Sequence, residues 1–161
     1  LMGPNLTRDN ASLLPMRKLL LISVLFLTGC TPVVNLEAAE GSNDPLCAEV
    51  SVRLPQELGN LKQRETNSQA TSAWGEPAAV LLRCGLEGVE VSTLPCVTAG
   101  DVDWLVDDSN APSYRFISYA RFPAVEVVVD STKASGVTSL EGLAQAVSQI
   151  PATKVCSEVQ N

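Results

Sequence analysis

Residues 124–130 read Ala-Val-Glu-Val-Val-Val-Asp, and this stretch is the strongest sign of a β-sheet in the chain. In an extended chain, Val125, Val127 and Val129 share one face, while Glu126 and Asp130 lie opposite. An apolar face backed by a charged one is typical of an antiparallel sheet that packs against a core on one side. We therefore predict a β-strand over residues 124–129.

Working outward, the same two-residue period predicts four more strands. The first begins near Ala78 and directs Val80, Leu82 and Cys84 to one face. The others cover residues 89–97, 102–106 and 114–120. In contrast, residues 56–73 are rich in Gln, Asn, Ser and Thr, so we expect a long loop with at most one helical turn.

Two helices are expected to flank this sheet. Asp44-Pro45 is a typical helix start and Pro55 a stop, although alternating apolar residues in between leave a strand open as an alternative. Near the end of the chain, Thr138 and Glu141 fit a capping box, and Pro151 ends an apolar stripe. The predicted fold is α+β: an antiparallel sheet of about four to five strands, with an N-terminal and a C-terminal helix on one face.

The N-terminal region resembles an export signal. Residues 16–18 (Met-Arg-Lys) precede an apolar run over residues 19–27, and residues 27–30 (Leu-Thr-Gly-Cys) resemble a bacterial lipobox. A transmembrane helix would need about 20 apolar residues, and a plain cleaved signal would leave a free cysteine. We predict that Cys30 receives a diacylglycerol and holds the protein on the extracytoplasmic face of the cell membrane.

The export signal divides the chain into four parts. We expect translation to begin at Met16, which makes residues 1–15 an upstream extension. Residues 16–29 are then the lipoprotein signal peptide, and residues 30–44 a lipidated flexible tether. Residues 45–161 are long enough for a single α+β globular domain.

The remaining cysteines indicate disulfide bonds. Cys47, Cys84, Cys96 and Cys156 form an even set in an exported domain, which predicts two disulfides with three possible connectivities. The chain has no histidine and no C-x-x-C pair, so we expect no metal site and no cofactor.

Charge and composition exclude several classes of function. The net charge is −7 and no basic run is present, which disfavours a nucleic-acid partner. Without histidine, and with the thiols lipidated or oxidised, nucleophilic catalysis lacks its usual base, so we assign no catalytic residue. The carboxylates at Asp101, Asp103, Asp107 and Asp108 are the one enzymatic alternative, and their simpler interpretation is solvated strand ends.

Two neighbouring segments resemble a known family. Residues 73–77 (Ala-Trp-Gly-Glu-Pro) and 82–86 (Leu-Arg-Cys-Gly-Leu) are similar to the signature of an actinobacterial lipoprotein family of unknown function, domain of unknown function 3515. The similarity extends to residues 47–55, 100–106 and 121–129. Leu86 departs from the family pattern, which more often has valine there. Members often keep only the cysteines that match Cys47 and Cys84, which implies the pairs Cys47–Cys84 and Cys96–Cys156.

The resemblance also highlights two tryptophans and two arginines. Trp74, Arg83, Trp104 and Arg121 could form a flat apolar platform with a fixed donor fork for sugars, peptides or carboxylates. The alternative is structural: Trp74 anchors a loop onto the core, and Arg83 pairs with an acid such as Glu126 across the sheet.

These observations lead to an expectation about function. We expect a membrane-anchored, extracytoplasmic envelope lipoprotein that acts as a non-catalytic binding or accessory module for an envelope protein or a cell-wall ligand. The alternatives are an envelope enzyme that uses the carboxylates of residues 101–108, and a purely structural envelope protein.

Overall fold

The computed structural model describes residues 32–156. The predicted signal peptide, the lipidation site Cys30 and the first two residues of the predicted tether lie outside the described residues. Residues from Val33 onward cluster as one compact unit. No helix among residues 32–156 is long and apolar enough to cross a membrane.

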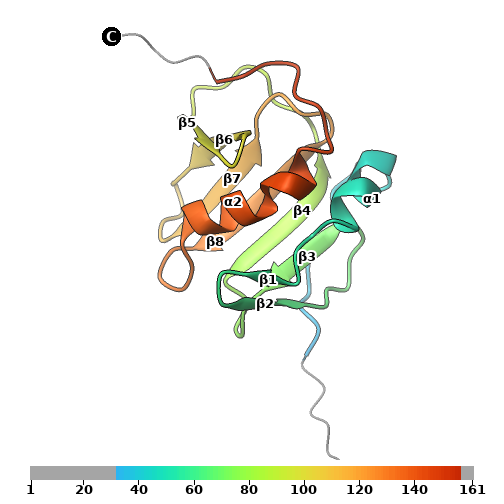
Figure 1. The fold of residues 1–161 in the computed structure, drawn as a ribbon, viewed down its shortest axis with the longest axis vertical. Helices are drawn as coiled ribbons and strands as arrows, with labels where there is room; N and C mark the ends of the chain where they lie inside the picture. Colours follow the sequence, from blue (N-terminus) through green and yellow to red (C-terminus); the bar gives the residue numbers. More distant parts are fainter. Residues whose placement is uncertain (1–31, 157–161) are drawn as a thin grey trace, which may run out of the picture. The chain divides into compact units, whose positions relative to one another are not determined.

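The domain is built on one antiparallel sheet of eight strands, in the order β1-β2-β3-β4-β8-β7-β6-β5 (Figure 1). The strands are β1 (Glu57–Leu58), β2 (Leu61–Arg64), β3 (Thr71–Trp74), β4 (Val80–Leu86), β5 (Cys96–Ala99), β6 (Val102–Asp107), β7 (Ser113–Ser118) and β8 (Ala124–Asp130). The helices are α1 (Pro45–Ser51), which precedes the strands, and α2 (Gly136–Val147), which follows them.

The predicted number of four to five strands is wrong, because residues 56–73 form β1, β2 and β3 instead of a long loop. Register pairs such as Gln63↔Trp74 and Arg64↔Ala73 extend the sheet beyond β4. Strand β2 is only partly buried, so polar side chains are tolerated there and no apolar alternation marks it.

The strand predicted over residues 89–97 is also wrong over most of its length. Only Cys96–Ala99 forms a strand, and Val89 makes an isolated bridge to Tyr119. The apolar residues Val89 and Leu94 pack instead against Leu105 and neighbouring side chains. Their hydrophobicity reflects contact with the sheet and not a place in it.

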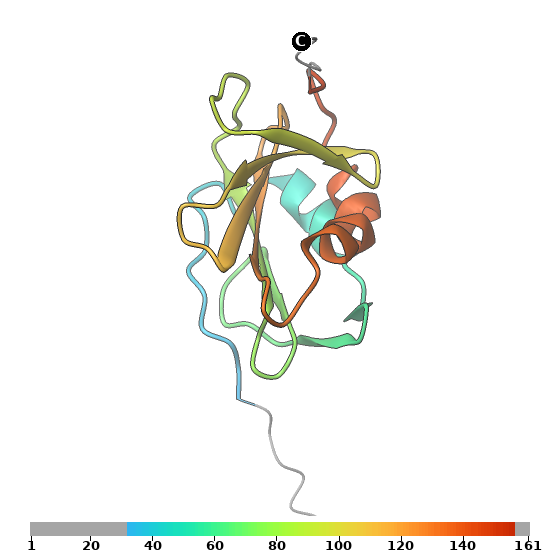
Figure 2. The same cartoon turned by 90° about the vertical axis from the view of Figure 1, so that its left-hand side faces the viewer.

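The inner face of the sheet, defined by Val125, Val127 and Val129, carries the core. These three valines are at most 1 % exposed. Both helices pack on this face, and Figure 2 shows them on one side of the sheet. The strand face that alternation predicts as apolar is therefore the face that the helices bury.

The two helix starts differ in how well the sequence predicts them. Helix α1 begins as expected, because the Asp44 side chain accepts a hydrogen bond of 2.8 Å from the N–H of Leu46. Helix α2 begins at Gly136, and its N-cap is Ser135, which accepts a hydrogen bond of 3.3 Å from the N–H of Thr138. The predicted capping box at Thr138 is therefore wrong: Thr138 is already inside the helix.

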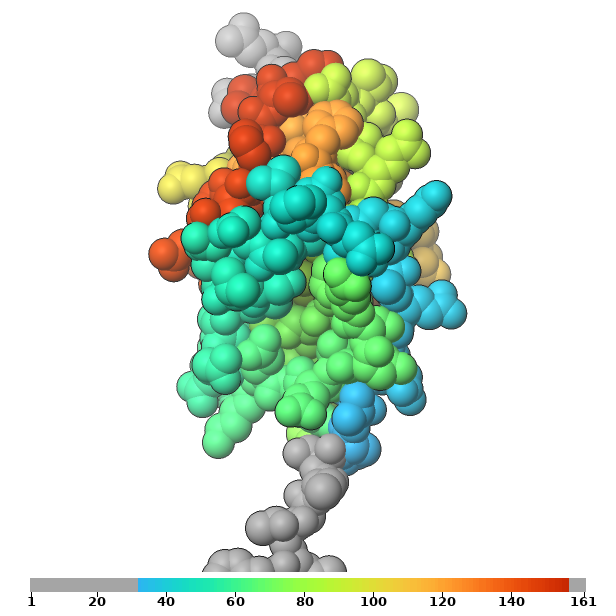
Figure 3. Space-filling view, turned by 90° about the vertical axis from the view of Figure 1, so that its right-hand side faces the viewer, coloured from blue at the N-terminus to red at the C-terminus, as the bar shows by residue number. Residues whose placement is uncertain are grey.

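Residues 33–44 run along the outer face, which is defined by Arg83 and Glu126, beside β4, and Figure 2 shows this segment in blue opposite the helices. Gly41 donates its N–H to the carbonyl of Gly85 at 2.9 Å. The N–H of Leu36 is bound by the Asn67 side chain at 2.8 Å. The described part of the expected tether thus lies against the domain, and Figure 3 shows this blue segment beside the green strands.

Candidate functional site

An apolar groove of about 480 Å³ opens on the inner face, between the first turn of α2 and strands β5, β6 and β7. None of its lining residues is charged. The groove is lined by Val97, Thr98, Ala99, Val106, Tyr114, Phe116, Val129, Ser131, Ser135, Gly136, Val137 and Leu140. Its size and apolar lining are typical of a site that holds an apolar group.

The groove arises because α2 covers only part of the inner face. The helix begins close to Phe116, since a Cβ on Gly136 would lie 3.3 Å from the Phe116 ring. Beyond this contact the sheet continues to β5, where Val97 is 41 % exposed, and the facing Val137 on α2 is 62 % exposed. Two valines therefore reach solvent at the mouth of an otherwise core-like surface.

The two tryptophans do not form a surface platform. Trp74 and Trp104 are both fully buried in the core cluster of the inner face. The indole N–H of Trp74 donates to the carbonyl of Pro55 at 2.9 Å, which anchors the chain after α1. The indole N–H of Trp104 has no hydrogen-bond partner among the described residues. Both side chains stabilise the fold and neither is accessible to a ligand.

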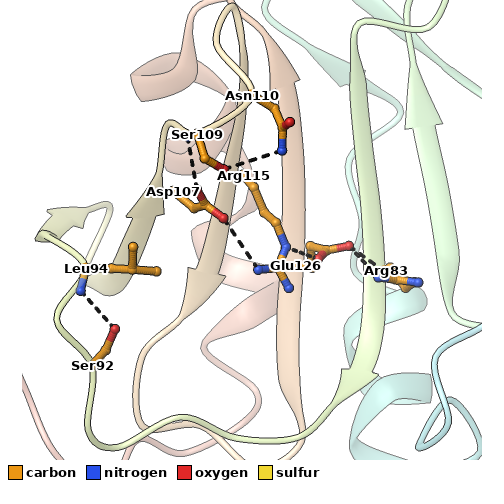
Figure 4. Close-up of polar contacts among 8 residues, drawn as sticks. All are labelled: Arg83, Ser92, Leu94, Asp107, Ser109, Asn110, Arg115 and Glu126. Atoms are coloured by element: carbon orange, nitrogen blue, oxygen red, sulfur yellow. Dashed lines mark hydrogen bonds and ion pairs between the residues drawn. The ribbon is translucent and has the colours of Figure 1, made fainter.

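Arg83 takes the structural role that the alternative interpretation gave it. Its Nη2 lies 2.8 Å from Oε1 of Glu126 on the neighbouring strand β8 (Figure 4). Arg115 of β7 binds the other carboxylate oxygen of Glu126, and its Nη1 lies 3.9 Å from Oδ2 of Asp107. Four side chains of alternating charge therefore form a row across the outer face. Arg83 is part of this row through its ion pair with Glu126.

Arg121 is buried beside the end of α2. The residue is 6 % exposed, and its Nη1 donates a hydrogen bond to the carbonyl of Ile150. Burial lowers the pKa of the Arg121 guanidinium, and the nearby charge of Asp103 acts in the opposite direction. Arg121 thus holds the turn that follows α2, away from solvent.

Asp103 and Asp107, two acidic residues of the alternative enzyme site, do not converge. Asp103 accepts hydrogen bonds from the Thr98 hydroxyl at 2.5 Å and from the N–H of Cys156 at 2.7 Å. Hydrogen bonds from the hydroxyl and N–H of Ser109 lower the pKa of Asp107. Along a strand, Asp103 and Asp107 are separated by about 13 Å. This exceeds the spacing of up to about 9.5 Å that paired catalytic carboxylates use.

Two disulfides join the elements. Cys47 of α1 is bonded to Cys84 of β4, and Cys96 of β5 is bonded to Cys156 near the end of the described chain. These are the pairs that the family resemblance implies. Within residues 32–156, no group of three or more His, Cys, Asp or Glu side chains lies close enough to hold a metal ion.

The groove residues are absent from the sequence-based candidates. Alternation does place Tyr114 and Phe116 on one face of their strand, and this is the only signal that could have pointed to them. That pattern predicts burial in the core and gives no sign of an opening. The opening depends on where α2 begins over the sheet, which no local pattern specifies.

Comparison with known proteins establishes the family. Residues 20–155 match the family described as a protein of unknown function (DUF3515). No curated protein and no solved structure matches the chain. The expected resemblance is thus confirmed at the level of the family, whereas actinobacterial origin and lipidation stay predictions. The match covers most of the sequence, and the chain belongs to this family of unknown function.

Proposed function

We propose that this protein is a membrane-anchored lipoprotein of the cell envelope, and that its domain is a non-catalytic binding or accessory module. The single observation that carries the binding role is the apolar groove beside β5 and α2. It is the part of the inner face where core-like side chains stay open to solvent, with Val97 and Val137 at the mouth.

The side chains that line the groove are better suited to binding a ligand than to catalysing its reaction. Acid–base catalysis needs a group that exchanges protons near neutral pH, most often histidine or a carboxylate. The groove offers hydroxyl groups, such as those of Ser131 and Ser135, and no charged side chain. The whole chain contains no histidine. An apolar group would gain about 25 cal/mol for each Å² of its surface that the groove removes from water.

The alternative functions gain less support. Asp103 and Asp107 lie apart on β6 and both accept hydrogen bonds, which does not favour an envelope enzyme. A purely structural protein has no need of an open apolar groove. It would be favoured only if the groove stayed empty in every binding experiment.

The anchor part of the proposal keeps the domain near the membrane. Val34 is already bound to the domain, because its N–H donates to the carbonyl of Glu65 at 2.9 Å. The four residues from Cys30 to Val34 span at most about 14 Å when fully extended. A lipid on Cys30 would therefore hold the domain close to the bilayer and restrict it to partners at the membrane surface.

Two measurements test this proposal separately. Cys30→Ser should move the protein from the membrane fraction to the soluble fraction and abolish labelling with a radioactive fatty acid. Membrane retention of this variant would refute the lipid anchor.

The binding role is tested by hydrogen exchange of the full chain in liposomes, with a panel of cell-wall precursors, glycans and peptides. A ligand should slow exchange in β5 and in the first turn of α2. The effect should vanish in Val137→Asp and persist in Val91→Asp, a control at a valine that is 89 % exposed and does not line the groove. Protection that survives Val137→Asp, or none with any compound, would count against a binding site here.

A further inference from the structure

Strand β5 is one end of the sheet and has a free side. It pairs with β6 alone, through Val97↔Trp104 and Ala99↔Val102. The N–H of Val106 donates to the carbonyl of Pro95 at 2.8 Å. This bond shows which residue pairs of β5 and β6 are hydrogen-bonded to each other. Because hydrogen-bonded pairs alternate along an antiparallel ladder, Cys96 and Thr98 direct their N–H and C=O groups away from β6.

This free side is little protected. Exposed edge strands usually carry a charge, an internal proline or a covering segment that prevents pairing with another chain. Residues 96–99 read Cys-Val-Thr-Ala, without charge or proline. The disulfide holds Cys156 beside Cys96, but the N–H of Cys156 binds the Asp103 side chain and not the backbone of β5. No other backbone hydrogen bond between described residues involves Cys96 or Thr98. The edge can therefore accept a further strand.

The free edge and the groove are continuous. Val97 and Ala99 of β5 line the groove, and Val137 faces them from α2. A strand added beside β5 would direct every second side chain to the inner face, into this apolar space, and the others to the outer face. Main-chain pairing and an apolar pocket thus act on one extended segment.

Negative charge at one end of the groove limits which partner segments can bind there. Gly100 brings the turn after β5 against α2, since a Cβ there would lie 3.1 Å from the Cα of Glu141. Asp101 and Glu141 are both exposed and have no ion-pair partner among the described residues. A basic side chain would complement them. A second copy of this acidic chain, with a net charge of −7, would not.

We infer that the edge of β5 and the adjoining groove bind an extended segment of a partner polypeptide, with alternating apolar side chains and a basic residue at the end that meets Asp101 and Glu141. This inference rests on the proposed binding function and specifies the class of its ligand.

The first test uses a synthetic peptide of about ten residues that alternates valine and threonine and ends in lysine. Its binding to the full chain in liposomes is measured by fluorescence anisotropy. Two N-methylated versions carry the methyl groups on alternate sets of amides. One of the two methylated peptides should bind about tenfold more weakly or worse, and the other should bind like the unmethylated peptide. The reason is that only one set of amides faces β5. Equal binding of both versions would overturn strand pairing.

The second test uses variants of the protein. Thr98→Pro removes an N–H that points to the free edge and leaves the hydrogen bonds to β6 intact. This variant should bind the peptide about tenfold more weakly. Val137→Asp should have a similar effect, and it keeps the test decisive if Thr98→Pro does not fold. Val91→Asp is the matched control. The double variant Asp101→Asn, Glu141→Gln should bind the lysine-ended peptide more weakly and should bind a glutamine-ended peptide as the wild type does.

The outcomes separate this inference from the proposed function. If no peptide binds while another compound still slows exchange in β5 and α2, the strand-addition site is wrong and the binding module stands. If the protein forms dimers on liposomes that Val97→Asp abolishes, the occupant is a second copy, and the inferred partner is wrong. If neither peptide nor panel compound binds, both proposals fail.

Discussion

Arg83 and Glu126 face each other on neighbouring strands, with 2.8 Å between Nη2 of the arginine and Oε1 of the glutamate. The Glu126 side chain is only 9 % exposed, and Arg115 binds its other oxygen. One nearly buried carboxylate therefore forms ion pairs with two arginines, each about one-third exposed, and Asp107 lies near the second of them. This arrangement explains why a charged residue is tolerated in the most apolar strand of the sheet.

Glu126→Gln should destabilise the fold by about 2 kcal/mol, because it removes the ion-pair partner of Arg83 and leaves Arg115 with Asp107 alone. The cost should fall short of that for a fully buried pair, since water reaches both guanidinium groups. Urea unfolding at neutral pH measures the free energy of unfolding. The control is Glu57→Gln, an exposed acid, with an expected change within about 0.5 kcal/mol. Equal effects of the two variants would show that the row of charges adds no stability.

Gly85→Ala should destabilise the protein strongly and release residues 33–44 from the domain. Gly85 has φ +109°, and a Cβ there would lie 2.4 Å from the backbone of Gly41. The Cβ fits only if the Gly41 backbone moves away and the positive φ is strained, so we expect a loss of about 2–4 kcal/mol. Limited proteolysis of residues 33–44 and urea unfolding measure the two effects.

The control for this glycine is Gly59→Ala. Gly59 also has positive φ, at +58°, but its Cβ would meet only the Thr138 methyl group at 3.7 Å. This variant should cost about 1 kcal/mol and leave proteolysis unchanged. If both glycines behaved alike, backbone strain alone would explain Gly85, and its close approach to Gly41 would not matter.

The sequence predicts the centre of the sheet better than its ends. The strands beginning at Val80, Val102, Ser113 and Ala124 match four predicted segments, because each has an apolar face that the core requires. Strands β1 to β3 cannot be recognised from the local sequence pattern. Their partly buried polar residues are extended because these strands extend the sheet from β4. Residues 89–95 mislead in the opposite direction, because Val89 and Leu94 pack on the outer face without forming a strand.

The candidate site shows a similar limit. Sequence reasoning favours tryptophan and arginine because these residues often bind ligands, yet Trp74 and Trp104 are buried and Arg121 binds the end of α2. Residue type does not report exposure. The groove depends on where a helix of twelve residues begins on an eight-stranded sheet, which is a property of tertiary packing.

Loss of the Cys47–Cys84 disulfide should destabilise the protein more than loss of Cys96–Cys156, although it closes the shorter loop. The bonds span 37 and 60 residues, so the loop entropy of each is about 4 kcal/mol. Cys47 and Cys84 are both fully buried, and replacing them with alanine also leaves a cavity in the core. Urea unfolding of the two double-alanine variants measures the difference. A larger loss for Cys96 and Cys156 would mean that loop length outweighs core packing.

Acid should weaken the contribution of Asp130 to stability. Hydrogen bonds from the Lys133 ammonium, the Thr132 hydroxyl and the Thr132 N–H lower the pKa of Asp130 from 3.8 to about 2. A carboxylate with a lowered folded-state pKa stabilises the fold above its unfolded pKa, and this contribution is lost as the pH falls through the folded value. The difference in unfolding free energy between wild type and Asp130→Asn should therefore be constant above pH 3.8 and shrink towards pH 2. Lys133→Gln should raise the Asp130 pKa in an NMR titration. A difference that stays constant down to pH 2 would contradict the lowered pKa.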